Sequence, residues 1–270
     1  MKEAKEKKNP EISVSITIST WGAFAVYVIT GLFLIFGFHV VRNKYSVDLI
    51  SDPTLTLRLL WIIEFPIVVI IYSLFRRNPE KCSYFRAVGR SLVGLIAGAL
   101  INALGAVSLG APIGMQSLSK TIHWSFLMSV FTVVPATAVL GASWIDWHRI
   151  FASLKPIGII EHMLLVPAYG AIIGGWFGAW PMPLDWERPW QEWPICVCYG
   201  AIGGYIGGQM LGLMRTCEAQ YLTVRVIYHG QTLSDDVACN YWLTGPQLCH
   251  RFTYMVKCCQ VQPLKHGPTP

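Results

Sequence analysis

The sequence predicts an all-α membrane protein, a bundle of about six transmembrane helices. Charged side chains make up only 13% of the 270 residues, against about 25% in ordinary soluble domains. They gather in short clusters between long apolar runs, which is typical of several membrane spans and not of one soluble core. Lysine and arginine flank these runs without forming a continuous basic stripe, so we expect no nucleic-acid partner.

The predicted elements begin with a charged segment, residues 1–20, which holds four lysines. The apolar run that follows is longer than the roughly 7–15 residues of a signal-peptide core, so we expect it to remain as the first span. A spanning helix needs about 20 mostly apolar residues, and lipid requires its backbone to be helical. Six segments meet or approach that length: Trp21–Val41, Leu59–Phe75, Ser91–Gly114, Trp124–Ala142, Ile157–Trp180 and Trp193–Met214.

These segments define a transmembrane domain over residues 21–214. The second span is the weakest, because it is short and contains Glu64 and Pro66. Residues 215–270 are mixed and polar, and we interpret them as a cytosolic tail, a candidate for disorder. Within this tail, Tyr221–Tyr228 has the composition of a short strand.

The distribution of lysine and arginine predicts the orientation. With six spans, both termini lie on one side, and that side carries 16 of the basic residues while the other carries 5. Positive loops favour the cytosol. We therefore expect both termini in the cytosol and the loop Pro181–Glu192 on the lumenal side.

Glycines recur every four residues in the last two predicted spans. A four-residue step keeps small residues on one helix face, so that another backbone can approach closely. One interpretation is internal packing of the two spans, and the other is a docking face for a helix of a partner protein. The glycines are Gly170, Gly174 and Gly178 in the fifth span and Gly200, Gly204, Gly208 and Gly212 in the sixth.

The loop between these spans is rich in tryptophan and proline, with four of each in residues 180–194. Tryptophan favours the membrane–water interface, so the loop is either an interfacial hairpin or a rigid lumenal contact surface for a partner or a lipid headgroup. In the second case Asp185, Glu187 and Arg188 can bind an ammonium or a phosphate. Acid–base catalysis by Asp185 and Glu187 is disfavoured, because a nucleophile and a metal-ligand set are both missing nearby.

Other polar groups predict no catalytic, cofactor or metal site. Glu161 begins the fifth span, where an ionisable group faces the protein interior, as a structural hydrogen-bond acceptor or as a functional contact. The sequence also lacks H-E-x-x-H, G-x-S-x-G and the phosphate-binding G-x-x-x-x-G-K-[ST] motif. The cysteines after Met214 lack the ligand spacing of zinc sites: Cys217, Cys239, Cys249, Cys258 and Cys259.

The loop also carries a family resemblance. The run Asp185-Trp186-Glu187-Arg188-Pro189-Trp190, preceded by Trp176-Phe177-Gly178-Ala179 and followed by Trp193-Pro194-Ile195, resembles the signature of the GPI biosynthesis family Pig-F. Weaker similarities are Gly110-Ala111-Pro112, the group Trp147, Arg149 and Phe151, and the acidic Glu161. The resemblance covers roughly residues 90–214.

This resemblance implies a function. Members of the family are endoplasmic reticulum membrane proteins that bind and stabilise GPI ethanolamine-phosphate transferases, whose catalytic subunits perform the transfer. It predicts a non-catalytic subunit whose partners are those transferases and membrane lipid, either a GPI precursor or phosphatidylethanolamine. Two alternatives are a small membrane transporter, which would need a polar pathway, and a stand-alone intramembrane lipid-modifying enzyme.

Overall fold

A computed structural model describes residues 20–77, 79–80 and 82–230, and all regular structure in this part of the chain is helical. The predicted all-α class is confirmed, and six helices are long and apolar enough to cross a membrane. The helices are α1 (Thr20–Tyr45), α2 (Pro53–Leu74), α3 (Tyr84–Ser108), α4 (Met115–Leu140), the short α5 (Trp144–Trp147), α6 (Ile159–Ala179) and α7 (Ile195–Gly230). A π-helical turn η1 (His148–Ala152) follows α5, and a 3-10 turn η2 (Pro189–Gln191) lies between α6 and α7.

The helix boundaries differ from the predicted spans at several ends, among them the starts of α3 at Tyr84 and of α4 at Met115. α2 begins at Pro53, because the Asp52 side chain accepts a hydrogen bond from the backbone N–H of Leu55 (3.0 Å) and caps the first turn. α3 ends at Ser108, before Gly110, which adopts a positive φ of 100° that ends the helix.

α7 continues through residues 215–230, where the sequence suggested a tail with a short strand. The first part of that tail is therefore helical. The segment 1–19, the tail residues 231–270 and the predicted tail cysteines other than Cys217 lie outside the described residues.

The helices pack around α4, which is the most buried of the six spans. It lies against α2, α3 and α6, while α1 packs between α2 and α7. On the outer faces of α1 and α3, large apolar side chains such as Leu32, Ile35, Ile101 and Leu104 are exposed, as a lipid-facing surface requires.

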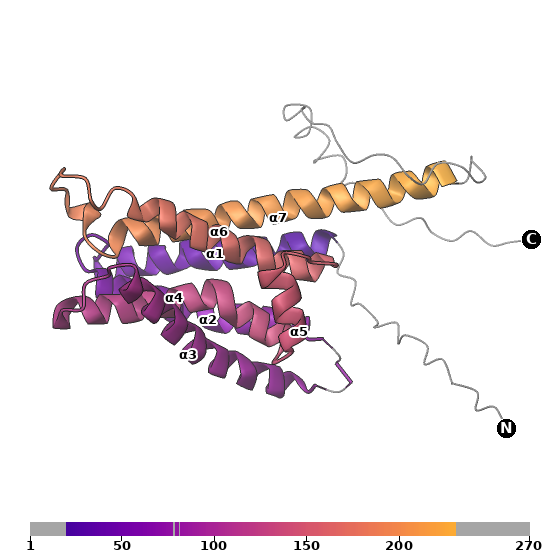
Figure 1. Ribbon diagram of the computed structural model, residues 1–270, viewed down its shortest axis with the longest axis horizontal. Helices are drawn as coiled ribbons and strands as arrows, with labels where there is room; N and C mark the ends of the chain where they lie inside the picture. Colours follow the sequence, from indigo (N-terminus) through magenta and orange to yellow (C-terminus); the bar gives the residue numbers. More distant parts are fainter. Residues whose placement is uncertain (1–19, 78, 81, 231–270) are drawn as a thin grey trace, which may run out of the picture.

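The connections separate to the two ends of the bundle (Figure 1). At one end lie residues 46–52, 109–114 and 180–194, and we call it the loop end. At the other lie residues 75–77, 79–80 and 82–83 and α5 with the residues up to 158, and we call it the α5 end. The last turns of α7 extend past the bundle at the α5 end (Figure 1).

The interior contains stacked aromatic rings and a few polar groups. Phe131 of α4 stacks on Tyr205 of α7 with ring centroids 4.2 Å apart, and Gln209 donates a hydrogen bond across to Thr30 (2.9 Å). Glu64 is fully buried, as predicted for an ionisable group within a span.

Candidate functional site

The glycines of α6 and α7 bring the two backbones into direct contact. A Cβ added to Gly174 would lie 2.8 Å from the Cα of Gly204 and would overlap the carbonyl oxygen of Gly200. Equivalent overlaps occur all along this contact, so no side chain fits there. We call it the glycine seam, made of Gly170, Gly174 and Gly178 of α6 with Gly200, Gly204 and Gly208 of α7.

Not every glycine of α7 belongs to the seam. A Cβ added to Gly203 or Gly207 would meet no atom within 4 Å, and Gly212 faces the Tyr27 hydroxyl of α1 instead. The face with Gly203 and Gly207 also exposes Tyr199 and Met210. Internal packing therefore occupies the seam, while the outer face of α7 with Gly203 and Gly207 is sterically open to a partner helix.

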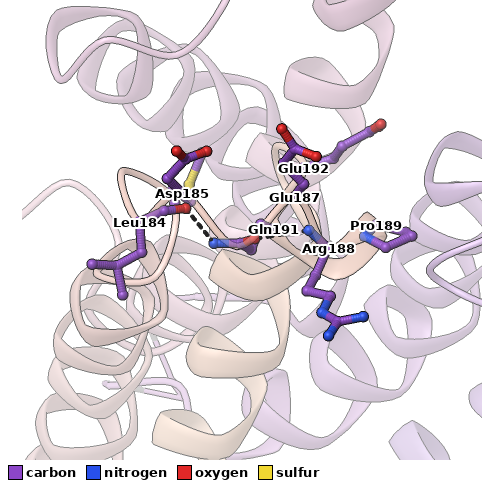
Figure 2. Close-up of a pocket in the computed structure, with 8 residues that line it drawn as sticks. Leu184, Asp185, Glu187, Arg188, Pro189, Gln191 and Glu192 are labelled. Atoms are coloured by element: carbon purple, nitrogen blue, oxygen red, sulfur yellow. Dashed lines mark hydrogen bonds between the residues drawn. The ribbon is translucent and has the colours of Figure 1, made fainter.

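The glycine seam carries the loop that joins α6 to α7, and Gln191 organises that loop. The Gln191 side-chain amide donates hydrogen bonds to the carbonyl oxygens of Pro181 (2.6 Å) and Leu184 (2.8 Å). Its amide oxygen accepts a hydrogen bond from the backbone N–H of Arg188 (2.9 Å), as Figure 2 shows in part. One buried side chain thus links the segment that leaves α6 to the segment that enters α7.

Tryptophan side chains attach the loop to α4. The Trp193 indole N–H donates to the Thr121 hydroxyl (2.9 Å), and its ring lies 5.3 Å from that of Trp124. Trp190 packs on the hydrophobic core while Trp186 stays exposed, with the two rings 6.0 Å apart in an edge-to-face arrangement. The loop is therefore attached to α4, and contact of its exposed side with a partner or a lipid stays a prediction.

The exposed side of the loop is acidic. Asp185, Glu187 and Glu192 are exposed, and in Figure 2 their carboxylates lie on one side of the loop while the guanidinium of Arg188 extends to the other. They line a surface depression of about 490 Å³ together with Met182, Leu184, Arg188, Pro189 and Gln191. Three carboxylates against one guanidinium leave this lining acidic, which favours a cation such as an ammonium group or a basic side chain of a partner.

Glu161 lies far from this loop, in the first turn of α6 at the α5 end. The Arg149 guanidinium donates two hydrogen bonds to its carboxylate (2.6 and 2.7 Å), and the backbone N–H of Ile157 donates a third (2.8 Å). Since α6 separates them by about 30 Å, Glu161 and the loop cannot contact the same headgroup. The structure supplies the structural partner that the sequence left open for Glu161.

The ion pair is part of a larger charge cluster. Arg149 also contacts Asp146 of α5 (3.2 Å), and Asp146 forms a second ion pair with Arg77 from the α2–α3 connection. Burial by itself would raise the pKa of Asp146, but hydrogen bonds from Ser143, Arg77 and Arg149 outweigh it and hold the pKa below its ordinary value. The hydrogen bonds to Glu161 raise the pKa of Arg149. This cluster ties together three segments of the α5 end.

Sequence reasoning missed Gln191, Asp146 and Arg77. The roles of Gln191 and Arg77 depend on partners that only the fold brings near. Gln191 binds carbonyl groups of the loop, and Arg77 binds a carboxylate 69 positions away in the sequence. Asp146 carried a weak signal, because it stands beside Trp147 and Arg149 in a short polar connection. In the described residues, no group of three or more histidine, cysteine or acidic side chains is placed to hold a metal ion.

Comparisons with known proteins agree on one family. The family model described as "GPI biosynthesis protein family Pig-F" matches residues 30–213. The human protein named "GPI ethanolamine phosphate transferase, stabilizing subunit" is 38% identical over 105 residues, which cover 39% of this chain and 48% of that protein. No solved structure matches.

Two fungal relatives extend the comparison. A Schizosaccharomyces pombe protein named "PIGF/3-ketodihydrosphingosine reductase fusion protein" is 35% identical over 150 residues, 55% of this chain and 30% of that protein. The Neurospora crassa "Glycosylphosphatidylinositol anchor biosynthesis protein 11" is 35% identical over 106 residues, 39% of this chain and 37% of that protein. The chain thus spans half or less of the length of these relatives.

Proposed function

Because this chain belongs to the Pig-F family of GPI biosynthesis proteins, we propose that it is a non-catalytic membrane subunit that binds and stabilises a GPI ethanolamine-phosphate transferase. The observation that carries the proposal is the family match over residues 30–213, which takes in the glycine seam, the loop, four complete spans and most of the other two. Human and mouse relatives are named as the stabilizing subunit of that transferase. Catalysis is assigned to the partner, and no cofactor is assigned to this chain.

We place the protein in the endoplasmic reticulum membrane with both termini in the cytosol. The excess of lysine and arginine on one side supports this orientation, and the two connections that carry part of this excess lie together at the α5 end (Figure 1). The loop end then faces the lumen. A glycosylation acceptor site inserted with a flexible spacer between Glu187 and Arg188 tests the orientation, because glycan addition requires a lumenal loop. If the loop stayed unmodified while an acceptor site in an N-terminal tag was glycosylated, the orientation would be the opposite of the one proposed.

The transferase contact is assigned to the loop residues Asp185–Trp190 and to the outer face of α7. Gln191 and the tryptophans hold the loop in one shape, so little conformational entropy is lost when a partner binds. The exposed Trp186 provides an apolar anchor, which is enriched in protein interfaces. Gly203 and Gly207 allow a partner helix to approach α7 closely.

The acidic depression extends the proposal to lipid. Phosphatidylethanolamine carries an ammonium group, and so does a GPI precursor that already bears ethanolamine phosphate. The carboxylates of Asp185, Glu187 and Glu192 suit such a group at the membrane surface. We assign this depression to contact with an ethanolamine-bearing lipid beside the transferase.

A mild-detergent pull-down of the tagged chain from its native membranes, followed by mass spectrometry, tests the subunit function. We expect a GPI ethanolamine-phosphate transferase to co-purify with the natural chain. The variant Trp186→Ala should recover less of it, while Leu32→Ala on the outer face of α1 should recover the natural amount.

A chain that purifies without a transferase would contradict the subunit function. Transfer activity from the purified chain alone would support a stand-alone enzyme instead. Equal recovery with Trp186→Ala would remove the loop from the interface but leave the subunit function standing.

A further inference from the structure

A second depression lies at the α5 end, on the opposite side of the membrane domain from the acidic loop. It has a volume of about 490 Å³ and lies between the connection that enters α6, the first two turns of α6, and α7. We call it the basic pocket; its lining residues are Leu154, Lys155, Pro156, His162, Leu165, Val166, Leu211 and Arg215.

The polar lining of the basic pocket is entirely basic. It consists of Lys155, His162 and Arg215, without a carboxylate. Two acidic groups close in sequence to Lys155 and His162 are engaged elsewhere, because Glu161 binds Arg149 and Asp146 binds Arg149 and Arg77. Glu218 lies one turn after Arg215 on α7 and does not line the pocket. Lys155 and Arg215 are exposed and form no ion pair with another described residue. The lining of the pocket therefore carries a net positive charge.

His162 adds a third nitrogen-bearing side chain to the lining. Its Nδ1 lies 3.0 Å from the carbonyl oxygen of Gly158, and because a carbonyl only accepts, Nδ1 carries the hydrogen. Nε2 remains for an external ligand.

The rest of the lining is apolar and continues into the membrane span. Leu165 and Val166 lie on α6 one turn further into its span than His162, and Leu211 lies on α7 one turn before Arg215. The spanning part of α7 ends at Glu218 and that of α6 begins at Ile159. The basic groups thus lie at the membrane boundary, with apolar side chains beneath them. A phospholipid has the matching arrangement, because its phosphate lies at the boundary and its acyl chains lie in the apolar layer.

We propose that the basic pocket binds the headgroup phosphate of an anionic phospholipid. Lys155 and Arg215 hold the phosphate oxygens, with Nε2 of His162 beside them, and the acyl chain lies along Leu165, Val166 and Leu211. A zwitterionic lipid is bound less well, because its ammonium group meets three basic side chains. This site is independent of the transferase proposal and lies in the opposite leaflet from the acidic loop.

The test uses the purified full chain in detergent micelles supplemented with phosphatidylglycerol or with phosphatidylcholine of the same acyl chains. Thermal unfolding and native mass spectrometry report the binding. We expect phosphatidylglycerol to bind and stabilise the protein more than phosphatidylcholine. In the double variant Lys155→Ala/Arg215→Ala, the apparent affinity for phosphatidylglycerol should fall at least about tenfold, since each basic side chain near an anionic surface contributes roughly 1 kcal/mol.

The matched control removes two exposed basic side chains from the loop end, Lys44→Ala/Arg58→Ala, and should leave the affinity unchanged. If the double variant of the pocket fails to fold, Leu211→Trp fills the pocket while keeping its charges and should abolish the preference. Equal effects of both lipids, or equal losses in pocket and control variants, would overturn the proposal. Stabilisation by inorganic phosphate alone that equals that by phosphatidylglycerol would assign the pocket to a free phosphate instead.

Discussion

At the residue scale, Gln191 and Glu192 are neighbours with very different expected contributions to stability. Gln191 is buried and makes three hydrogen bonds within the loop. Glu192 forms one ion pair with Lys120 at 3.5 Å, and its side chain is 68% exposed. Surface ion pairs contribute little, whereas buried groups left without a hydrogen bond destabilise the fold by about 1–3 kcal/mol each.

The substitution Gln191→Ala should therefore destabilise the protein by about 1–3 kcal/mol, because the loop loses the three hydrogen bonds of one buried side chain. Glu192→Ala, the adjacent control, should change stability by less than about 1 kcal/mol. Thermal unfolding of the purified protein in detergent measures both. Equal effects of the two substitutions would contradict the organising role of Gln191.

A second prediction concerns the ion pair between Arg149 and Glu161. Removing the charge in Glu161→Gln should destabilise the protein by about 1–3 kcal/mol, because it weakens two charge-assisted hydrogen bonds to a partly buried guanidinium. Arg149→Lys should have a comparable effect, since an ammonium cannot bind the carboxylate in the same two-point geometry. Melting curves that coincide with that of the natural protein would contradict the structural role of Glu161 and favour a functional contact instead.

The lowered pKa of Asp146 predicts a dependence on pH. Its carboxylate is more acidic in the folded protein than in the unfolded chain, so its contribution is fully present above the ordinary aspartate pKa of about 3.9. That contribution is lost as the pH falls through the lower pKa of the folded state. Asp146→Asn should thus be less stable than the natural protein at neutral pH, and the two melting temperatures should begin to converge as the pH falls below the ordinary aspartate pKa of about 3.9. A constant difference would contradict this.

At the scale of elements, the glycine seam is the contact least tolerant of substitution. Gly174→Leu and Gly204→Leu must each separate the backbones of α6 and α7, and we expect a large loss of folded protein and of any co-purifying transferase. Gly207→Leu changes the same residue type on the same helix but points into open space. Fluorescence-detected gel filtration compares the three variants.

Gly207→Leu should fold like the natural chain. If it then loses the transferase, the outer face of α7 is the docking face; if it keeps the transferase, the loop remains as the assigned contact. A well-folded Gly174→Leu variant would show that the close backbone approach is not needed.

The elements were largely predictable from hydropathy, because lipid leaves a spanning segment no alternative to a helix. The boundaries were not, since they depend on local chemistry such as the Asp52 cap at the start of α2 and the positive φ of Gly110 after α3. The helical residues 215–230 were missed because they are polar and follow the apolar span without a break. In the candidate site, spacing alone identified the glycines, whereas the sequence offered no partner for Gln191.

At the scale of the whole molecule, the two ends carry opposite chemistry. The loop end presents an acidic depression and the α5 end a basic pocket, and the ion pairs of Arg149 and Asp146 bind the α5 end together without reaching the loop. The two surfaces therefore face different leaflets and different ligands. Variants at one end should leave ligand binding at the other unchanged.

The glycine seam also bears on how the chain enters the membrane during synthesis. α7 is the least hydrophobic of the six spans, so by itself it partitions weakly from the translocon into lipid. Its backbone meets that of α6 along most of α6, and the loop of residues 180–194 joins the two helices directly. We therefore expect α7 to leave the translocon against α6, as one hairpin; in a glycosylation reporter, α7 should insert poorly alone and efficiently when α6 precedes it.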